Sequence, residues 1–486
     1  MRYPHIMTPA AVVLACSIAL AQDGKAPLPD PVIICPPKAA PIETFAAQEL
    51  ACAIEGMTGK KVAVVNAVSG AKQSKIVLLS GTVQAKGPAP SQAYSLHYGE
   101  KDGKPEVLLT GKDRGLLYAV RDLIGKHLSA KDKELFVERI SVTEGPAVPR
   151  RVLWVWLHNL KGKWKPFLDF ASEWKCTGVV IWGLDAWKDE KHQAFCRELC
   201  AYAHERGIDV LHGFGINGYH EGKHVCQTVP EAKAVIPKKF HDTQNGKWSL
   251  EAIYCPSNEK AKAKIKEMLL KATDAGVDGF NFETADVDYI MCHCPKCEAH
   301  FKHQNEEVHA NKPIEWPIEH TNMAVQFLTK ERPKLWLCAE YAIQKFDKRP
   351  YVGSKKLERL AKEINNRCTI VWCESMAPPQ QIAEALIRMR PESGYYVRSG
   401  AILGIENSKK SKWENELAAM KGLIPLGPRC IMYRSGIPGG YLAAKMAIAA
   451  EAMWNPKRPD TYFQTLFDRV MALAAPGGEY AVEKKK

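Results

Sequence analysis

The sequence predicts a small α+β domain over residues 31–145, followed by a (β/α)8 TIM-like barrel over residues 150–475. Three observations support this prediction. The 486 residues are too many for one ordinary core. The hydrophobic content of 46% and the charged content of 25% are those of a globular protein. From Arg150 onward, short apolar runs alternate with helical patterns, as in a closed parallel barrel.

The predicted barrel strands are eight short apolar runs, and helical patterns such as 193–205, 261–275 and 354–364 lie between them. No glycine-rich phosphate-binding pattern follows any of these runs, which favours a barrel over an open doubly wound sheet. The runs cover residues 152–157, 178–182, 208–211, 277–282, 335–338, 369–372, 394–397 and 430–433.

The first domain has a mixed pattern of strands and helices. Two of its strands flank a Gly-containing segment at 99–103, which indicates a hairpin, and a Pro- and Gly-rich linker at 145–149 follows the domain. The predicted strands cover 31–35, 62–65, 76–79, 94–98, 107–110 and 137–142, and the predicted helices cover 46–57 and the segment from 111–115 to Leu123.

Residues 1–21 have the pattern of a signal peptide. Arg2 and His5 precede an apolar run at 10–21, which is too short to span a bilayer and ends in a small-x-small cleavage pattern. We therefore expect export to the periplasm or the extracellular space, with a lipoprotein anchored at Cys16 as the alternative. No later segment is long and apolar enough to predict a membrane span.

The net charge of +13 does not indicate a nucleic-acid partner. The basic residues are dispersed, and the only compact basic run is the tail at 483–486. No nucleic-acid-binding motif is present.

Several motifs of the first domain resemble a known family. They are AAQELA at 46–51, MTG at 57–59, LSG at 79–81 and LTGKDRGLLYA at 109–119. This pattern resembles the non-catalytic domain that precedes the barrel in family 20 β-hexosaminidases and α-glucuronidases, and AEAMWNP at 450–456 is similar to a closing helix and turn of such enzymes. The resemblance implies a secreted glycoside hydrolase with a carbohydrate substrate and a site at the C-terminal mouth of the barrel.

One difference from that family concerns the fourth strand. Family 20 enzymes carry an adjacent Asp-Glu pair after this strand, whereas this chain has FETADVD at 282–288. The resemblance therefore does not extend to the substrate-assisted mechanism or to an N-acetylhexosamine substrate.

Three glutamates directly follow apolar barrel strands, namely Glu283, Glu340 and Glu374. Side chains at the C-terminal strand ends of such a barrel converge on one site. Glycoside hydrolysis needs one carboxylic acid to protonate the leaving oxygen and a second group that stabilises, attacks or activates water. We predict Glu283 as the acid and Glu340 or Glu374 as its partner. Structural ion pairs with arginines are the alternative role, and neither role requires a cofactor.

Other residues near the strand ends are candidates for substrate binding. Tryptophan rings stack on sugars, and arginines bind a carboxylate by paired hydrogen bonds. Asp286 and Asp288 lie farther along the loop after the fourth strand, where the alternative role is to cap a helix. The full set is Asp286, Asp288, His158, Trp182, His212, Trp372, Arg398, Tyr433 and Arg434.

A cysteine cluster follows the fourth strand. Cys292, Cys294 and Cys297 lie within six residues, and Cys255 lies one strand earlier. Four such ligands suit a structural tetrahedral zinc site. In an exported protein the same cysteines suit disulfides, for instance to Cys255 or Cys226, and the sequence does not choose between the two.

Together these observations predict a secreted glycoside hydrolase-like enzyme that cleaves a glycan or oligosaccharide. Two alternatives remain open: a non-catalytic glycan-binding or scaffold protein on a degenerate barrel, and a zinc-dependent hydrolase that uses these cysteines together with His300 and His303, which follow them in the sequence.

Overall fold

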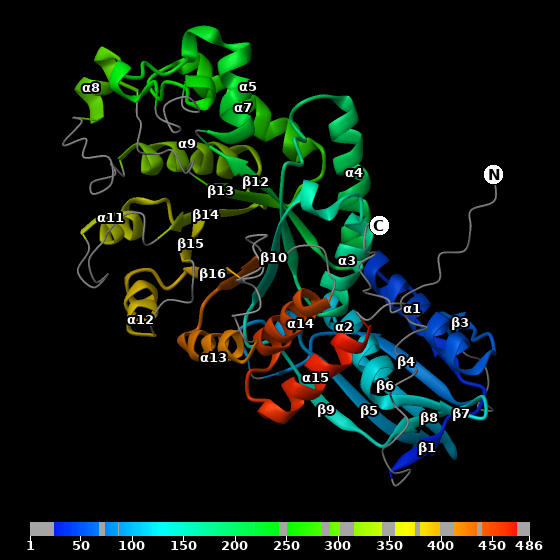
Figure 1. Ribbon diagram of the computed structural model, residues 1–486. Coiled ribbons are helices and arrows are strands. Elements are labelled where there is room, and N and C mark those ends of the chain that lie inside the picture. The colour runs from blue at the N-terminus through cyan, green and yellow to red at the C-terminus, as the bar shows by residue number, and fades with distance from the viewer. Residues whose placement is uncertain are drawn as a thin grey trace, which may run out of the picture.

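The structure is a computed structural model, and it shows two packed units (Figure 1). Small sheets and two helices form the N-terminal unit, and a closed barrel with surrounding helices forms the larger unit. The structure describes residues 24–67, 73–85, 87–216, 218–242, 250–283, 292–301, 315–342, 355–374, 380–398, 413–434 and 440–473.

The N-terminal unit contains a six-stranded sheet in the order β3-β2-β4-β6-β5-β9 and a three-stranded sheet in the order β1-β8-β7. Helices α1 (Pro41–Thr58) and α2 (Arg114–Asp122) pack against each other and share one apolar core with the strands. The strands are β1 (Lys25–Pro27), β2 (Val32–Ile34), β3 (Val64–Val65), β4 (Lys75–Ser80), β5 (Tyr94–Lys101), β6 (Lys104–Gly111), β7 (Leu128–Lys131), β8 (Glu134–Glu138) and β9 (Ser141–Glu144).

The structure adds two strands that were not predicted, β1 and β7, and corrects one that was. The sequence predicted a single strand over 137–142, but the chain leaves the three-stranded sheet after Glu138 and joins the six-stranded sheet at Ser141. β8 pairs with β1 and β7, whereas β9 pairs with β5. The apolar pattern runs through both strands because both face one continuous core, so the switch between sheets left no gap in the sequence pattern.

All eight predicted barrel strands are confirmed, and each is parallel to its neighbours in a closed ring (Figure 1). The last strand pairs with the first, for example through Val152 and Met432. The strands are β10 (Arg150–Trp156), β11 (Gly178–Trp182), β12 (Asp209–Gly215), β13 (Gly279–Glu283), β14 (Trp336–Ala342), β15 (Cys368–Glu374), β16 (Gly394–Arg398) and β17 (Cys430–Arg434).

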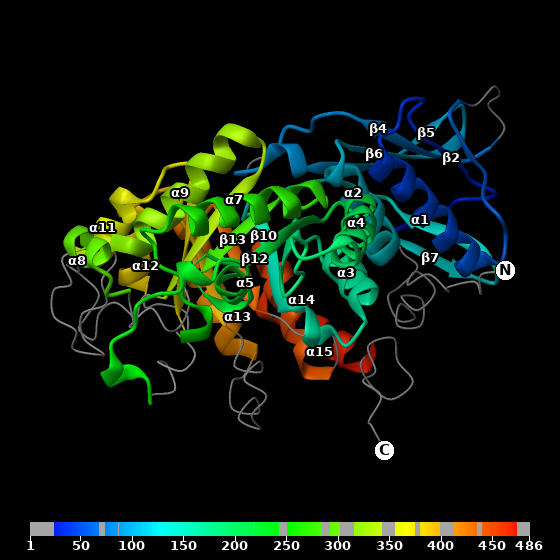
Figure 2. The ribbon, with the colours of Figure 1, turned by 90° about the horizontal axis from the view of Figure 1, so that it is seen from above.

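Helices surround the barrel, as the view from above in Figure 2 shows. Within the described ranges, no helix combines the length and the apolar character that a bilayer crossing requires. The helices are α3 (Trp164–Glu173), α4 (Glu190–Glu205), α5 (Tyr219–Thr228), α7 (Glu259–Asp274), α8 (Pro295–Phe301), α9 (Glu315–Glu331), α11 (Lys355–Glu363), α12 (Gln380–Met389), α13 (Trp413–Leu423), α14 (Gly440–Trp454) and α15 (Asp460–Leu473).

The N-terminal unit packs against the starts of the first barrel strands. Arg114 of α2 donates to the carbonyl of Gly207 at 2.5 Å and pairs with Asp209, where β12 begins. Lys175, which precedes β11, lies 2.7 Å from Asp122 of α2. In a parallel barrel the strand starts and the strand ends lie at opposite mouths. The N-terminal unit therefore occupies the end of the barrel away from the predicted site.

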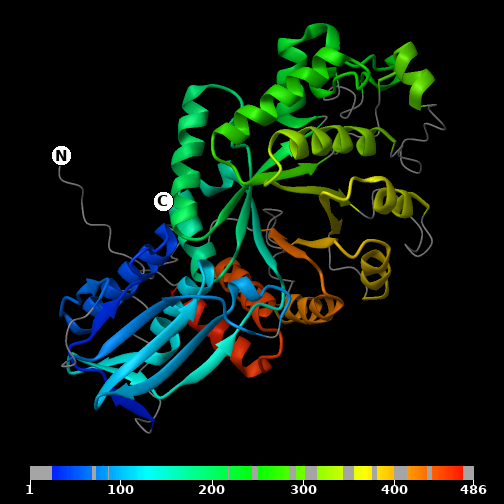
Figure 3. The same ribbon diagram turned by 180° about the vertical axis from the view of Figure 1, so that it is seen from behind.

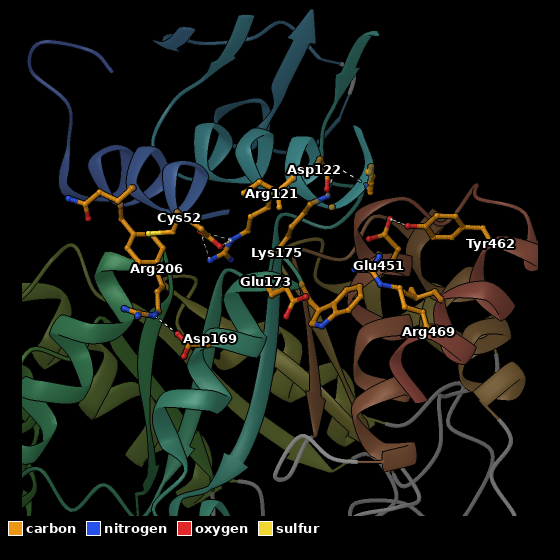
Figure 4. A pocket seen from close by; sticks show the side chains of 18 residues that line it. Cys52, Arg121, Asp122, Asp169, Glu173, Lys175, Arg206, Glu451, Tyr462 and Arg469 are labelled. Carbon is orange, nitrogen blue, oxygen red and sulfur yellow. Dashed lines mark hydrogen bonds and ion pairs between the residues drawn. The ribbon is translucent and has the colours of Figure 1, made fainter. Parts of the chain in front are cut away.

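A cavity of about 270 Å³ lies in this interface between α1, α2, α3 and α15 (Figure 4). Charged side chains that line the cavity form ion pairs with each other: Arg121 lies 3.1 Å from Glu49, and Arg206 pairs with Asp169. The cavity lies between the two units, at the barrel mouth where the strands begin. It is therefore separate from the opposite mouth, where the predicted catalytic glutamates lie.

Candidate active site

Alternate residues of each barrel strand face either the lumen or the surrounding helices. One buried cluster contains Val152, Val180, Leu211 and Val371, and these residues fill the lumen. A much larger cluster joins the intervening strand residues to the helices. This alternation determines which side chains at the strand ends can meet in one site.

Glu283 and Glu340 come together on the lumen side of neighbouring strands. They are register partners at the ends of β13 and β14. Glu340 is 4% exposed, and the side-chain amide of Asn281 donates to its Oε2 at 3.1 Å. Asn281 is itself fully buried, and its Oδ1 has no hydrogen-bond partner within the described part of the chain. Two carboxylates and an amide therefore face the same end of the lumen.

Tyr219 connects the first turn of α5 to this carboxylate pair. Its hydroxyl donates to Oε1 of Glu283 at 3.4 Å. Its ring lies 5.5 Å from the ring of Trp182 and 6.5 Å from that of Trp156. The tyrosine therefore forms a bridge between an aromatic wall and the predicted acid.

Two glycines of β12 make this arrangement possible. A Cβ atom at Gly213 would lie 2.4 Å from the indole of Trp182, and one at Gly215 would lie 2.7 Å from the ring of Tyr219. Real Cβ atoms do not approach so closely, so any larger residue would push the rings away. Gly213 and Gly215 both take lumen positions on the strand that separates β11 from β13.

The aromatic wall comes mainly from the first two barrel strands. Trp156 lies 5.2 Å from Trp182, and Trp154 lies 6.0 Å from Trp182, measured between ring centroids. His158, which follows β10, has its ring 5.7 Å from that of Trp156. Flat rings next to carboxylates suit the apolar face of a sugar and its hydroxyl groups. Trp182 thus packs against the same tyrosine that donates to Glu283, and His158 lies at the other end of this wall, against Trp156.

Arg434 extends the site on the opposite side of β10. Its guanidinium lies 4.6 Å from the ring centroid of Trp154, and its Nε is buried without a hydrogen-bond partner among the described residues. The backbone of Arg398 pairs in register with that of Arg434. The guanidinium of Arg434 therefore lies next to the aromatic wall, where an anionic or hydroxyl group of a ligand would complete its hydrogen bonds.

Three predicted substrate contacts do not lie at this mouth. His212, Trp372 and Tyr433 are fully buried. Trp372 and Tyr433 belong to the cluster between the strands and the helices, and the ring of His212 packs against Phe214 and Phe280 of the same cluster. The prediction rested on their position near a strand end. Successive side chains of a strand point to opposite faces, however, and these three point toward the helices and away from the lumen. We therefore remove them from the set of substrate contacts.

The structure does not describe the side chains of four other predicted residues. Asp286 and Asp288 lie outside the described residues. For Glu374 and Arg398, only the backbone positions at the ends of β15 and β16 are described. Their roles remain predictions.

A second group of ionisable residues lies beside β12 at the start of α5. Nδ1 of His220 lies 3.4 Å from Oδ1 of Asp185, and this hydrogen bond raises the pKa of His220. Glu221 is 2% exposed, and the backbone N–H of Gly215 donates to it at 3.2 Å. Burial, aided by the charge of Asp185, raises the pKa of Glu221 to about 8. Glu221 is therefore a protonated carboxylic acid at neutral pH, close to the strand that carries Gly215.

Tyr219, Glu221 and Asn281 were not predicted. Asn281 had a usable signal, because it stands two residues before Glu283 and must face the same side of the strand. Tyr219 and Glu221 had none, since they lie on a helix whose approach to β12 depends on the space left by Gly215.

The four predicted cysteines also come together. The Sγ atoms of Cys255, Cys292, Cys294 and Cys297 all lie within 4.8 Å of one another, and no disulfide joins any two of these four residues in the structure. The predicted disulfide alternative is therefore not the state that the structure shows. Zinc ions favour such a set of soft ligands.

No protein-family model and no curated protein matches this sequence. Among solved structures, the chain is similar to an exo-β-N-acetylglucosaminidase of family 20 from Vibrio harveyi, with a TM-score of 0.64 at 12% identity over 95% of this chain and 76% of that one. It is also similar to a β-N-acetylhexosaminidase from Bacteroides fragilis, with a TM-score of 0.63 at 12% identity over 94% of both chains.

A chitobiase from Flavobacterium johnsoniae gives a TM-score of 0.59 at 13% identity, over 93% of this chain and 70% of that one. These matches extend over the N-terminal unit as well as the barrel. The chain thus has the two-part fold of the family 20 glycoside hydrolases, a small α+β domain followed by a (β/α)8 barrel.

Proposed function

We propose that this protein is a glycoside hydrolase that cleaves a glycosidic bond of a glycan or oligosaccharide by acid catalysis from a carboxyl group. The observation that carries the proposal is the register pair of Glu283 and Glu340 at the lumen ends of neighbouring strands. The aromatic wall of Trp156 and Trp182 beside this pair supports a sugar ligand. The solved structures that share the fold are named as enzymes acting on N-acetylglucosaminides or N-acetylhexosaminides.

In this proposal Glu283 is the general acid. Its side chain is partly exposed, so it can reach a substrate oxygen, whereas Glu340 is buried. Glu283 gives its proton to the glycosidic oxygen as the bond between that oxygen and the anomeric carbon breaks. Water then supplies the hydroxyl group to the anomeric carbon. The remaining proton of this water goes to the carboxylate of Glu283, which is then protonated again. The hydroxyl of Tyr219 holds the carboxyl group in place throughout.

Glu340 is proposed as the partner carboxylate. The amide of Asn281 fixes one of its oxygens at 3.1 Å. A carboxylate on the lumen side stabilises the positive charge that develops on the sugar ring during bond breaking. The reaction uses no cofactor, and the cysteine cluster supplies no catalytic group in it.

Kinetic assays of the purified protein on a panel of aryl glycosides, including N-acetylglucosaminides and uronides, test this function. Glu283→Gln should lower kcat by about 10²- to 10⁴-fold, the usual contribution of a general acid. Glu331→Gln is the control, because Glu331 is exposed at the end of α9, where the chain enters the start of β14. Equal turnover by the wild type and Glu283→Gln would refute the role of Glu283. Glycan binding by the wild type without turnover would favour the non-catalytic alternative.

We also propose that the protein is exported, on the basis of the signal-peptide pattern at 1–21, which lies outside the described residues. Cell fractionation with N-terminal sequencing of the mature protein tests this. A new N-terminus at Gln22 in the exported fraction is the expected result. Intact Met1 in the cytoplasm would contradict it, and a lipid-modified Cys16 would indicate the lipoprotein alternative.

A further inference from the structure

Four thiols from two distant parts of the chain meet beside the barrel. Cys255 lies just before α7, and the other three cysteines lie at or just before the start of α8. Sγ of Cys255 is 3.6 Å from that of Cys294 and 3.5 Å from that of Cys297. A tetrahedral zinc ion with Zn–S bonds of about 2.3 Å places its sulfurs about 3.8 Å apart. The spacing of these thiols is therefore close to that of a zinc tetrathiolate.

Backbone hydrogen bonds hold the two parts together through a third segment. The N–H of Cys255 donates to the carbonyl of Ala232 at 2.6 Å, and that of Ala234 donates to Ile253 at 3.0 Å. On its other side, the same segment accepts a hydrogen bond at 2.8 Å, from His293 to the carbonyl of Val235. The cysteines are thus positioned by main-chain pairing, which does not depend on a bond between the sulfurs.

Hydrogen-bond donors point at the sulfur atoms. The N–H of Val235 donates to Sγ of Cys292 at 3.3 Å, and the N–H of Cys297 donates to Sγ of Cys294 at 3.5 Å. The hydroxyl of Ser257 lies 3.2 Å from Sγ of Cys297. Donors of this kind offset negative charge on thiolate ligands and orient them toward a metal.

We propose that Cys255, Cys292, Cys294 and Cys297 bind one structural Zn²⁺ as four thiolates. Each thiol loses its proton to solvent when the metal binds, and no electron is transferred. A set of four soft sulfur ligands favours zinc over calcium or magnesium, which prefer oxygen. Four protein ligands leave no coordination position for water, so the ion has a structural role and not a catalytic one.

The location of the site fits this role. Helix α8 lies at the end of the molecule away from the N-terminal sheets (Figure 1, and from behind in Figure 3). The apolar residues around the cysteines include Ile253 and Trp316, and Tyr219 packs against the same cluster. The zinc site therefore supports the segment of α5 from which Tyr219 reaches Glu283. The inference itself does not depend on glycosidase activity.

Metal analysis of the full chain, purified without chelator, provides the first test. The expected result is one zinc ion per chain and four cysteines that become reactive only when the zinc is removed. Replacement by Co²⁺ should give the intense sulfur-to-cobalt charge-transfer absorption and the visible bands of a tetrahedral thiolate site. Protein without zinc, disulfides among these four cysteines, or iron with inorganic sulfide would each overturn the proposal.

A pair of cysteine variants provides the second test. Cys294→Ser should bind zinc at least tenfold more weakly in competition with a chromophoric chelator, because it removes one of four ligands. Cys52→Ser is the matched control, since Cys52 is an exposed free thiol on α1, and it should keep the wild-type zinc content. If Cys294→Ser does not fold, titration of the wild type with a mercurial reagent replaces it. Release of one zinc per four thiols modified is expected, and modification without zinc release would contradict the site.

Discussion

The hydroxyl of Tyr219 donates to Oε1 of Glu283 at 3.4 Å and so links the start of α5 to the end of β13. This contact places the predicted acid next to the aromatic wall, because the ring of Tyr219 also lies 5.5 Å from Trp182. A hydroxyl that donates to a carboxyl group stabilises its ionised form more than its protonated form. Tyr219 therefore has two expected effects on Glu283, one on position and one on acidity.

Tyr219→Phe removes only the hydroxyl. We expect kcat/KM on a cleaved glycoside to fall by about five- to tenfold, which corresponds to one hydrogen bond of about 1 kcal/mol. The acidic group seen in the pH–rate profile should shift to higher pKa, because its ionised form loses a donor. The measurement is the pH dependence of kcat/KM. Tyr202→Phe is the control, because the hydroxyl of Tyr202 bonds to Asp169 at 2.9 Å, away from the mouth. A loss of activity without any pKa shift would limit Tyr219 to positioning.

Gly215→Ala tests the same contact from the other side. The added Cβ would lie 2.7 Å from the ring of Tyr219 and 2.9 Å from the carbonyl oxygen of Gly218, so the start of α5 must move. We expect activity to fall at least as far as in Tyr219→Phe, and the thermal unfolding midpoint to fall as well, since overpacking costs about 1–3 kcal/mol. Assays and thermal unfolding on the same samples check this. Gly422→Ala is the control, because a Cβ there meets no neighbour within 4 Å. Unchanged activity in Gly215→Ala would show that Tyr219 need not lie where the structure places it.

Glu221→Gln should change how stability depends on pH. The pKa of Glu221 is raised to about 8 in the folded protein by burial, and the unfolded value is about 4.3. The stabilising effect of the protonated form is therefore complete below about pH 4 and is lost as the pH rises toward 8. Glutamine mimics the protonated acid, so the variant should gain on the wild type by about 1.4 kcal/mol per pH unit between about pH 5 and 7.

Denaturant unfolding at pH 5, 6 and 7 measures this difference. Glu331→Gln is the control, because Glu331 is exposed, and its free energy of unfolding should equal that of the wild type at each pH. If the difference between Glu221→Gln and the wild type were the same at all three pH values, Glu221 would not be a buried neutral acid.

The fold was predictable because hydrophobic periodicity reports burial directly. Each of the eight barrel strands is a short apolar run between helical patterns, and the sequence predicted all eight. In the N-terminal unit, strands β1 and β7 were not predicted, and the single strand predicted over 137–142 is in fact parts of two strands, because strands of two different sheets face one core there. Periodicity detects the core that a residue faces but does not detect the sheet to which it belongs.

The site was less predictable for two physical reasons. The position of a residue at a strand end does not give the direction of its side chain, so Trp372 and Tyr433 were chosen although they face the helices. Glu283 and Glu340 were chosen by the same rule and face the lumen. Tyr219 was not predicted because it lies on helix α5 and its contact depends on Gly215 of strand β12, and no local sequence pattern indicates such a contact.

Asp122→Asn tests what holds the N-terminal unit to the barrel. The side chain of Asp122 is 7% exposed and lies 2.7 Å from Lys175 and 2.9 Å from Lys126. Burial alone would raise the pKa of Asp122, but the two ammonium groups hold it well below its usual range. Its stabilising effect is therefore present above about pH 4 and declines as the pH falls below that value.

At pH 7 we expect Asp122→Asn to lower the free energy of unfolding by about 3–5 kcal/mol, because it leaves the buried ammonium of Lys175 without its charged partner. The gap between variant and wild type should narrow as the pH falls below about 4. Adding Lys175→Met to the variant should restore much of the loss, since the unpaired charge is then removed. Asp30→Asn breaks an exposed pair with Lys60 and should cost less than about 1 kcal/mol. Denaturant unfolding of all four proteins separates these cases, and equal losses in Asp122→Asn and Asp30→Asn would show that the pair across the interface contributes no more than a surface ion pair.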